Sequence, residues 1–178
     1  MEQIEKIIIA IDPSTTETGL VLFKNEKNVN EDLIDAKGLI YNAKGKLLKR
    51  RGAFDPEIFA DKIELIFLKI KKQYNYTDAD FYVILPKMSG ALNYNTIDKL
   101  SRLSGIVHGI ASTLNFNVLY VNENSARSRV LKNRRGESYK EKAIELSGYD
   151  NDNLADAYVL GKAFINYYDS ERELFKEF

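Results

Sequence analysis

The sequence contains no cysteine and no tryptophan, only three prolines, and a single histidine, His108. Without cysteine the chain can form neither a disulfide nor a thiolate zinc site, which favours a reducing compartment. One histidine cannot build a zinc site of several imidazoles. No apolar run reaches the ~20 residues of a membrane-spanning helix, and the first residues, MEQIEK, lack the order of a signal peptide. We therefore expect a soluble, cytoplasmic protein with no membrane association.

An excess of positive charge is also missing. The 26 Lys and Arg residues are balanced by 26 Asp and Glu residues, so the formal net charge is zero. Any binding of nucleic acid must therefore depend on local basic patches. The 178 residues, 44% of them hydrophobic, suffice for one core without metal or disulfide support. No repeat or linker divides the chain, so we predict a single domain over residues 1–178.

Hydrophobic patterning predicts five strands and four helices. We expect strands at 6–11, 19–23, near 38–41, at 80–85 and at 117–121. We expect helices at 55–74, 95–114, 138–146 and 153–168. Three antiparallel strands followed by strands that alternate with helices indicate a mixed five-stranded α/β sheet with helices on both faces. In such sheets functional sites gather at the carboxyl ends of central strands.

Asp12 ends the first predicted strand, in the stretch IAIDPSTTETG. One interpretation is a turn starter that hydrogen-bonds its own backbone. The alternative is a carboxylate on the floor of a cleft, where neighbouring small residues leave room for a phosphate or a metal ion. Those small residues are Ser14, Thr15, Thr16 and Gly19.

Asp156 is the second candidate, because it lies in the mostly apolar stretch LADAYVL near the end of the chain. An unpaired carboxylate is costly to bury, so we expect a metal ion or a basic partner beside it. An exposed position on the helix is the alternative.

Four stretches resemble the RuvC-type Holliday junction resolvases of the ribonuclease-H-like superfamily, in particular their small bacteriophage members. IIAIDPSTTETGLVLF looks like the first strand and turn of that family, and DFYVIL is similar to its fourth strand. KLSRLSGIVHGI resembles its central helix, and DNLADAYVLGKAF its last, acid-bearing helix. The resemblance implies a ribonuclease-H-like fold and a homodimeric endonuclease that resolves Holliday junctions or other branched DNA. It also implies Mg²⁺ or Mn²⁺ as cofactor, and no organic cofactor.

The resemblance assigns the metal ions to carboxylates on rigid elements, which polarise the scissile phosphate and generate hydroxide. Asp12 and Asp156 match two of the family's ligands. Asn153 matches the position of a third, on the same helical face as Asp156, and can offer a carbonyl oxygen.

Pro86 departs from the family pattern, because it stands where a glutamate should end the fourth strand, and proline has no side-chain ligand. Either another carboxylate replaces that glutamate, with Glu123 and Asp152 as candidates, or the site holds metal poorly. In the second case the protein binds branched DNA and cuts it weakly or not at all.

Two basic clusters are candidates for contact with DNA phosphates. The first comprises Lys44, Lys46, Lys49, Arg50 and Arg51, and is interpreted as the solvated edge of a hairpin. The second is favoured, because it lies between the fifth strand and the acidic helix. It comprises Arg127, Arg129, Lys132, Arg134, Arg135, Lys140 and Lys142. Lys140 also resembles a family lysine that can contact the scissile phosphate.

Aromatic and small side chains give weaker indications. Tyr94 can stack on an unpaired base at a junction, or pack against its own domain. His108 is expected to pack in an interface or in the core. Ser101, Ser104 and Gly105 would allow the close approach of a partner helix, or of the sheet of the same chain.

The stretch AIDPSTTETG also looks like the phosphate-binding loop of the actin, sugar-kinase and chaperone ATPases. Those proteins close two such domains over a nucleotide, and this chain has no second copy of the loop, which disfavours an ATPase. A catalytically inactive module that binds junctions or other partners is the third alternative.

Overall fold

The structure, a computed structural model, describes residues 5–14, 16–24, 27–34, 40–41, 47–48, 55–74, 80–87, 94–132 and 137–177. In residues 30–34, 40–41 and 47–48 it describes the backbone alone. None of the helices in these ranges is long and apolar enough to cross a membrane.

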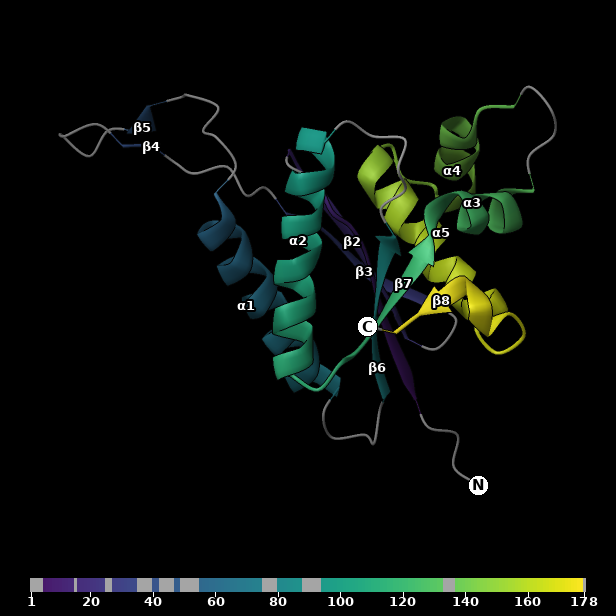
Figure 1. Ribbon diagram of the computed structural model, residues 1–178, viewed down its shortest axis with the longest axis horizontal. Helices are drawn as coiled ribbons and strands as arrows, with labels where there is room; N and C mark the ends of the chain where they lie inside the picture. The colour runs from purple at the N-terminus through teal and green to yellow at the C-terminus, as the bar shows by residue number, and fades with distance from the viewer. Residues whose placement is uncertain are drawn as a thin grey trace.

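A six-stranded mixed sheet forms the centre of the fold, in the order β3-β2-β1-β6-β7-β8 (Figure 1). Its strands are β1 (Lys6–Asp12), β2 (Thr18–Lys24), β3 (Lys27–Ile34), β6 (Asp80–Lys87), β7 (Asn117–Asn122) and β8 (Phe175–Lys176). The three strands β1, β6 and β7 are parallel, and the remaining pairs are antiparallel. The last residues of β1, β6 and β7 therefore lie along one edge of the sheet.

Helices cover both faces of this sheet (Figure 1). α1 (Pro56–Tyr74) and α2 (Tyr94–Thr113) pack on one face. α5 (Asp152–Tyr167) packs on the other face, together with α3 (Glu123–Leu131) and α4 (Tyr139–Ser147). The predicted mixed α/β architecture is confirmed.

The side chains of β1 alternate between the two faces, which explains its uninterrupted apolar run. Ile7, Ile9 and Ile11 belong to the core under α1 and α2, whereas Ile8 and Ala10 belong to the core under α5. All five are buried. The same alternation directs the next even-numbered residue, Asp12, to the α5 face.

Three details differ from the sequence-based prediction. The sheet has six strands instead of five, because β8 pairs with β7 at one edge. The third strand is Lys27–Ile34, whereas Ile40–Tyr41 pairs with Leu47–Leu48 in a separate two-stranded sheet. β6 continues through Pro86 to Lys87, since its pairing with β7 extends to the end of both strands.

Candidate functional site

The turn after β1 is closed without help from Asp12. The N–H of Ser14 donates to Thr18 Oγ1 at 3.1 Å, and that hydroxyl donates to the carbonyl of Ser14 at 3.1 Å. Thr18 is fully buried. Among the described residues no hydrogen bond reaches the carboxyl of Asp12, which disfavours its interpretation as a simple turn starter. The turn fixes the end of β1 and leaves the carboxyl of Asp12 available.

Gly19 lies opposite Asp12 on β2, and α5 packs directly against it. A Cβ atom at Gly19 would lie 2.2 Å from the carbonyl oxygen of Asn153 and 2.7 Å from the backbone nitrogen of Leu154. The expectation that Gly19 makes room for a phosphate or a metal ion is therefore wrong. It makes room for the first turn of α5, and this close approach brings α5 beside the end of β1.

Side-chain amides fasten the start of α5 to the same turn. Asn151 caps the helix by accepting a hydrogen bond from the N–H of Leu154 at 3.1 Å. Its amide also donates to Glu17 Oε2 at 2.9 Å, and the amide of Asn153 donates to the carbonyl of Glu17 at 2.7 Å. In this structure Asn153 positions the helix that carries Asp156. Its predicted role as a metal ligand stays a prediction.

Glu123 enters the site through α3, a helix that the sequence-based assignment missed. The side chain of Asn122 caps this helix by accepting from the N–H of Ser125 at 3.0 Å, so Glu123 is its first residue. Arg127 follows one turn later on the same side of the helix. The capping asparagine before ENSARSRVL was the signal for this helix, but the segment is short and has no apolar period.

Arg127 bridges two carboxylates. Its Nη2 lies 2.5 Å from Glu123 Oε1 and 2.8 Å from Asp156 Oδ2. The three side chains keep 26%, 36% and 21% of their accessible surface, respectively, so each is half-buried at the rim of the protein. Asp156 thus has the basic partner that its apolar surroundings required. Arg127 belongs to the second basic cluster, which was predicted to contact DNA phosphates. In this structure its guanidinium contacts the acids instead.

The carboxyl of Asp12 is coupled electrostatically to Glu123, Asp156 and Arg127, which perturb its pKa. Burial raises the pKa of Asp12 well above its usual 3.8, Asp156 and Glu123 raise it further, and Arg127 opposes them. Burial is also the main cause that raises the pKa of Glu123. Burial disfavours the charged guanidinium, but Glu123 and Asp156 outweigh this effect and raise the pKa of Arg127. We call Asp12, Glu123 and Asp156 the acidic cluster.

Pro86 also faces this cluster. β1 and β6 are parallel, and their last paired residues are Ala10 and Ile84, which both belong to the core under α5. Because side chains alternate along a strand, Asp12 and Pro86, two residues further on, also face α5. A carboxylate at position 86 would therefore lie next to Asp12. Pro86 is instead buried and apolar. The third acid comes from Glu123, just beyond the neighbouring strand β7.

The acidic cluster fits a hard divalent cation by its chemistry, because carboxylate oxygens are the ligands that Mg²⁺ and Mn²⁺ prefer. Its arrangement does not fit one. Within the described ranges, no group of three or more His, Cys, Asp or Glu side chains is placed to hold a metal ion. Asp152, the other candidate for the missing acid, forms an ion pair with Lys140 instead.

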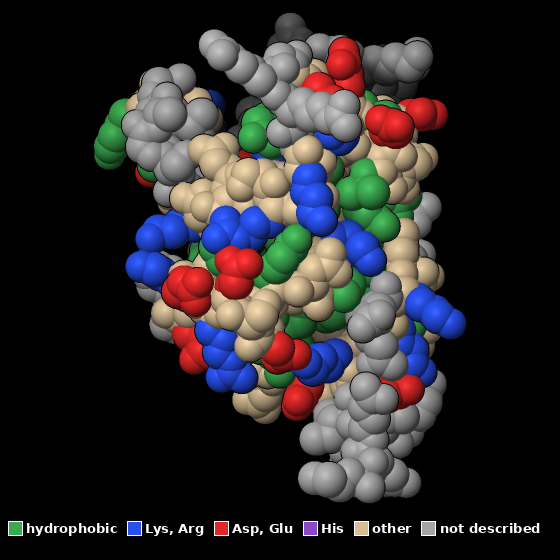
Figure 2. Space-filling view, turned by 90° about the vertical axis from the view of Figure 1, so that its right-hand side faces the viewer, with side chains coloured by type: hydrophobic (Ala, Val, Ile, Leu, Met, Phe, Trp, Pro, Cys, Tyr) green, Lys and Arg blue, Asp and Glu red, His purple; other side chains and the backbone are tan. Residues whose placement is uncertain are grey.

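Several side chains of the second basic cluster also pair with acids of the chain. Arg129 Nε lies 2.6 Å from Glu171 Oε2, and Lys142 Nζ lies 2.7 Å from Glu137 Oε2. Lys132 is exposed at the end of α3. Arg134, Arg135 and the whole first basic cluster lie outside the described residues. Figure 2, which faces the side of α3, α4 and α5, shows basic and acidic side chains interspersed rather than one positive field.

Two candidates for contacts outside the cluster lie on α2. Tyr94 is the first residue of α2, the helix that follows β6 in the chain, and 81% of its surface is exposed. Stacking on a base stays a prediction. His108 is half-buried, and its Nδ1 and the hydroxyl of Tyr120 on β7 form a hydrogen bond of 3.1 Å, so it contacts its own sheet; packing in an interface stays a prediction.

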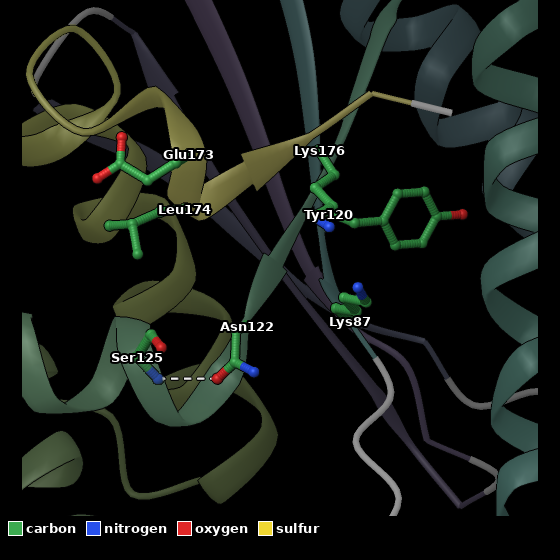
Figure 3. Close-up of a pocket in the computed structure, with 7 residues that line it drawn as sticks. All are labelled: Lys87, Tyr120, Asn122, Ser125, Glu173, Leu174 and Lys176. Carbon is green, nitrogen blue, oxygen red and sulfur yellow. Dashed lines mark hydrogen bonds between the residues drawn. The ribbon is translucent and has the colours of Figure 1, made fainter.

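A pocket that sequence reasoning missed opens at the same edge of the sheet. It has a volume of about 390 Å³ and is lined by Lys87, Tyr120, Asn122, Ser125, Glu173, Leu174 and Lys176. Lys87 lies beside Asn122 in the sheet, and Lys176 lies beside Tyr120. Figure 3 shows the side-chain nitrogens of Lys87 and Lys176 directed toward one another beside Tyr120. We call this the lysine pocket; Asn122, the residue before Glu123, is part of its lining.

Solved structures share this fold across nearly the whole chain. RuvC of T. thermophilus in complex with a Holliday junction substrate matches with a TM-score of 0.64, at 13% identity, over 97% of this chain and 99% of its own. A second structure of T. thermophilus RuvC gives 0.63 at 12% identity, over 97% and 99%. The yeast mitochondrial Holliday junction resolvase Ydc2 gives 0.56 at 13% identity, over 89% and 77%. The fold of this protein is therefore that of RuvC, as the resemblance of its motifs implied.

No family model matches this chain, and no curated protein matches it. At such low identity to the solved structures the likeness establishes the fold, and the function must be argued from the site.

Proposed function

We propose that this protein is an endonuclease for branched DNA, with four-way junctions as its principal substrate. The observation that supports the proposal is that Asp12, which ends β1 of a RuvC-like sheet, is coupled electrostatically to Glu123 and Asp156, the two acids paired with Arg127. These acids come from β1, α3 and α5. The turn after β1, the cap of α3 and the close packing of α5 against Gly19 position them. A phosphodiester nuclease of this fold uses such acids to activate water and to stabilise the leaving oxygen.

The nuclease would depend on Mg²⁺ or Mn²⁺, with Asp12, Asp156 and Glu123 as ligands. The bound cation would supply Lewis-acid activation of the phosphate and lower the pKa of the attacking water. The chain's own part is to hold the acids on rigid elements. Asn153 anchors α5 to the turn after β1, and Gly19 allows that helix to approach.

DNA would approach along the edge of the sheet where β1, β6 and β7 end. The lysine pocket supports this path, because it places Lys87 and Lys176 on the same edge as the acidic cluster, but on the opposite face of the sheet. Exposed Tyr94 lies at the start of α2, which follows β6 at that edge. Phosphate contacts on one side of the edge and acids on the other would hold a strand across it. The predicted contributions of Lys140 and of the second basic cluster would add to this grip.

The decisive experiment is incubation of the protein with a synthetic four-way junction and a linear duplex of the same sequence, in Mg²⁺ and in Mn²⁺. We expect nicking of the junction in preference to the duplex. Asp12→Asn and Asp156→Asn should each abolish nicking and leave junction binding largely intact. Nicking by Asp12→Asn at the wild-type rate would refute the assignment of the site.

A junction-binding protein with weak or no nuclease activity is the second candidate function, and Pro86 is the observation that favours it. Pro86→Glu restores an acid next to Asp12. If the wild type binds the junction without nicking it and only Pro86→Glu cuts, this second function is correct. If both cut, Glu123 is a sufficient replacement.

We also propose that the protein is a homodimer that contacts its partner through α2. Ser101 and Gly105 are exposed on α2, and a Cβ atom at Gly105 would meet nothing within 4 Å. Light scattering after size-exclusion chromatography tests this, with a monomer mass as the contrary result. A cytoplasmic location also stays a prediction.

A further inference from the structure

Arg127 occupies the position in the acidic cluster that a cation of the proposed nuclease would need. Its guanidinium contacts oxygens of two of the three acids, at 2.5 and 2.8 Å. Those oxygens cannot also bind a divalent cation from the same side while they are paired with an arginine, since Mg²⁺ requires ligands at about 2.1 Å. Two positive charges in one half-buried site also repel each other.

The third acid has no such partner. Within the parts of the chain that the structure describes, no hydrogen bond or ion pair reaches the carboxyl of Asp12, although Asp12 interacts electrostatically with Asp156, Glu123 and Arg127. One guanidinium thus pairs with two of the three carboxyl groups, and the carboxyl of Asp12 is left without a contact. Three carboxyl groups beside a single guanidinium favour its replacement by a cation of higher charge.

The position of Arg127 allows it to leave. It lies on α3, one turn after Glu123, and keeps 26% of its side-chain surface exposed. Both of its ion pairs are made by Nη2, the far end of a flexible side chain. Rotation about its side-chain bonds can move the guanidinium toward solvent or a phosphate without any change in the backbone.

We propose that Arg127 and a divalent cation are alternative occupants of the acidic cluster. Arg127 neutralises the acids in the metal-free protein and must be displaced before the cation is held by Asp12, Glu123 and Asp156. The inference rests on the metal dependence within the proposed function. Displacement of Arg127 explains why the acidic cluster has carboxylate ligands suited to a metal ion although, with Arg127 in place, the ligands are not arranged around one. It also makes Arg127 the residue that sets the metal concentration at which the site fills.

Calorimetric titration of the DNA-free protein with Mn²⁺ tests the proposal. Arg127→Gln removes the positive charge, and Arg129→Gln is the matched control, because Arg129 lies on the same helix and pairs with Glu171 instead. We expect Arg127→Gln to bind Mn²⁺ about tenfold more tightly than the wild type, and Arg129→Gln to bind it with unchanged affinity. Equal or weaker binding by Arg127→Gln would overturn the proposal, as would a wild type and an Arg127→Gln variant that both fail to bind.

A second measurement does not depend on the folding of a variant. In the wild type, the Nε–Hε resonance of Arg127 in a ¹⁵N NMR spectrum should move toward the position of a solvent-exposed arginine as Mg²⁺ is added, while that of Arg129 stays in place. An Arg127 resonance that stays unchanged while Mg²⁺ binds would contradict displacement. Neither measurement uses DNA cleavage. A protein that exchanges Arg127 for metal and never cuts a junction would therefore refute the proposed nuclease and leave this inference standing.

Discussion

The contact between Gly19 and α5 yields a prediction about both stability and site geometry. In Gly19→Ala the new Cβ atom would lie 2.2 Å from the carbonyl oxygen of Asn153 and 2.3 Å from its carbonyl carbon. Ordinary contacts of this kind are about 3.5 Å, so α5 or β2 must move by roughly 1 Å. The obstacle is backbone on both sides, and no side-chain rotation can relieve it.

Overpacking of a well-packed core costs about 1–3 kcal/mol, and a backbone obstacle places Gly19→Ala at or above the upper end. For a chain of this size each kcal/mol lowers Tm by about 2–4 °C, so we expect a loss of about 6–12 °C. The displaced helix carries Asp156, and Gly19 pairs with Asp12. Nicking of a junction should therefore fall further than the stability loss alone explains, at a temperature where the variant is fully folded.

Thermal unfolding followed by circular dichroism measures the first effect. Gly109→Ala is the matched control, because a Cβ atom at Gly109 on α2 meets nothing within 4 Å, and alanine favours a helix over glycine by about 1 kcal/mol. Gly109→Ala should be as stable as the wild type or more so. A Gly19→Ala protein with an unchanged Tm would refute the close packing of α5 on β2, and with it the reason given for the position of Asp156.

Three further predictions concern charge. The pKa of Asp12 is raised in the folded state, so the folded protein binds this proton more tightly than the unfolded chain, and stability is lost as pH rises above 3.8 through the raised value. Asp12→Asn should abolish this loss, so its advantage in unfolding free energy over the wild type should grow as pH rises above 3.8, by at most about 1.4 kcal/mol per pH unit. Denaturant titrations at several pH values that show a constant difference would contradict it. In the lysine pocket, Lys87→Gln and Lys176→Gln should each weaken junction binding and lower the slope of log affinity against log salt by about 1, whereas Lys69→Gln on the exposed side of α1 should change neither. Equal slopes for all three variants in fluorescence anisotropy would exclude the pocket from the DNA path. Pro86→Glu adds a carboxylate beside Asp12, so it should lower Tm in the absence of metal and increase the rise in Tm that Mn²⁺ produces; a Tm unaffected by Mn²⁺ would argue against a metal site at this edge.

The parallel core of the fold could be read from local patterns. The apolar run of β1 is buried on both faces, and the period of α1 matches its buried residues Phe59, Ile63, Phe67 and Ile70. The elements that were missed or misplaced are those that local pattern does not specify. α3 is short and polar, β8 has two residues, and β3 is the polar stretch KNVNEDLI. β3 and β8 are formed by pairing with β2 and β7, and α3 is formed by packing against α5.

The sequence predicts two acids of the proposed site, because each stands at an unusual place. Asp12 ends a buried strand, and Asp156 interrupts an apolar helix face. Glu123 was one of two candidates for the acid missing at Pro86, and spacing along the chain could not choose between it and Asp152. The choice depends on where α3 begins, and Asn122 decides that by capping the helix one residue before Glu123.

The sequence by itself determined the order of the main strands and helices and marked Asp12 and Asp156 as candidate acids, since each depends on neighbours along the chain. The glutamate missing at Pro86 was an expectation from the family resemblance. Only the tertiary structure decided which charges meet. Arg127 belongs by sequence to a basic cluster suited to DNA, yet it lies between Glu123 and Asp156, because α3 and α5 pack side by side on one face of the sheet. Contacts between residues so far apart in the chain follow from packing, and no local period encodes them.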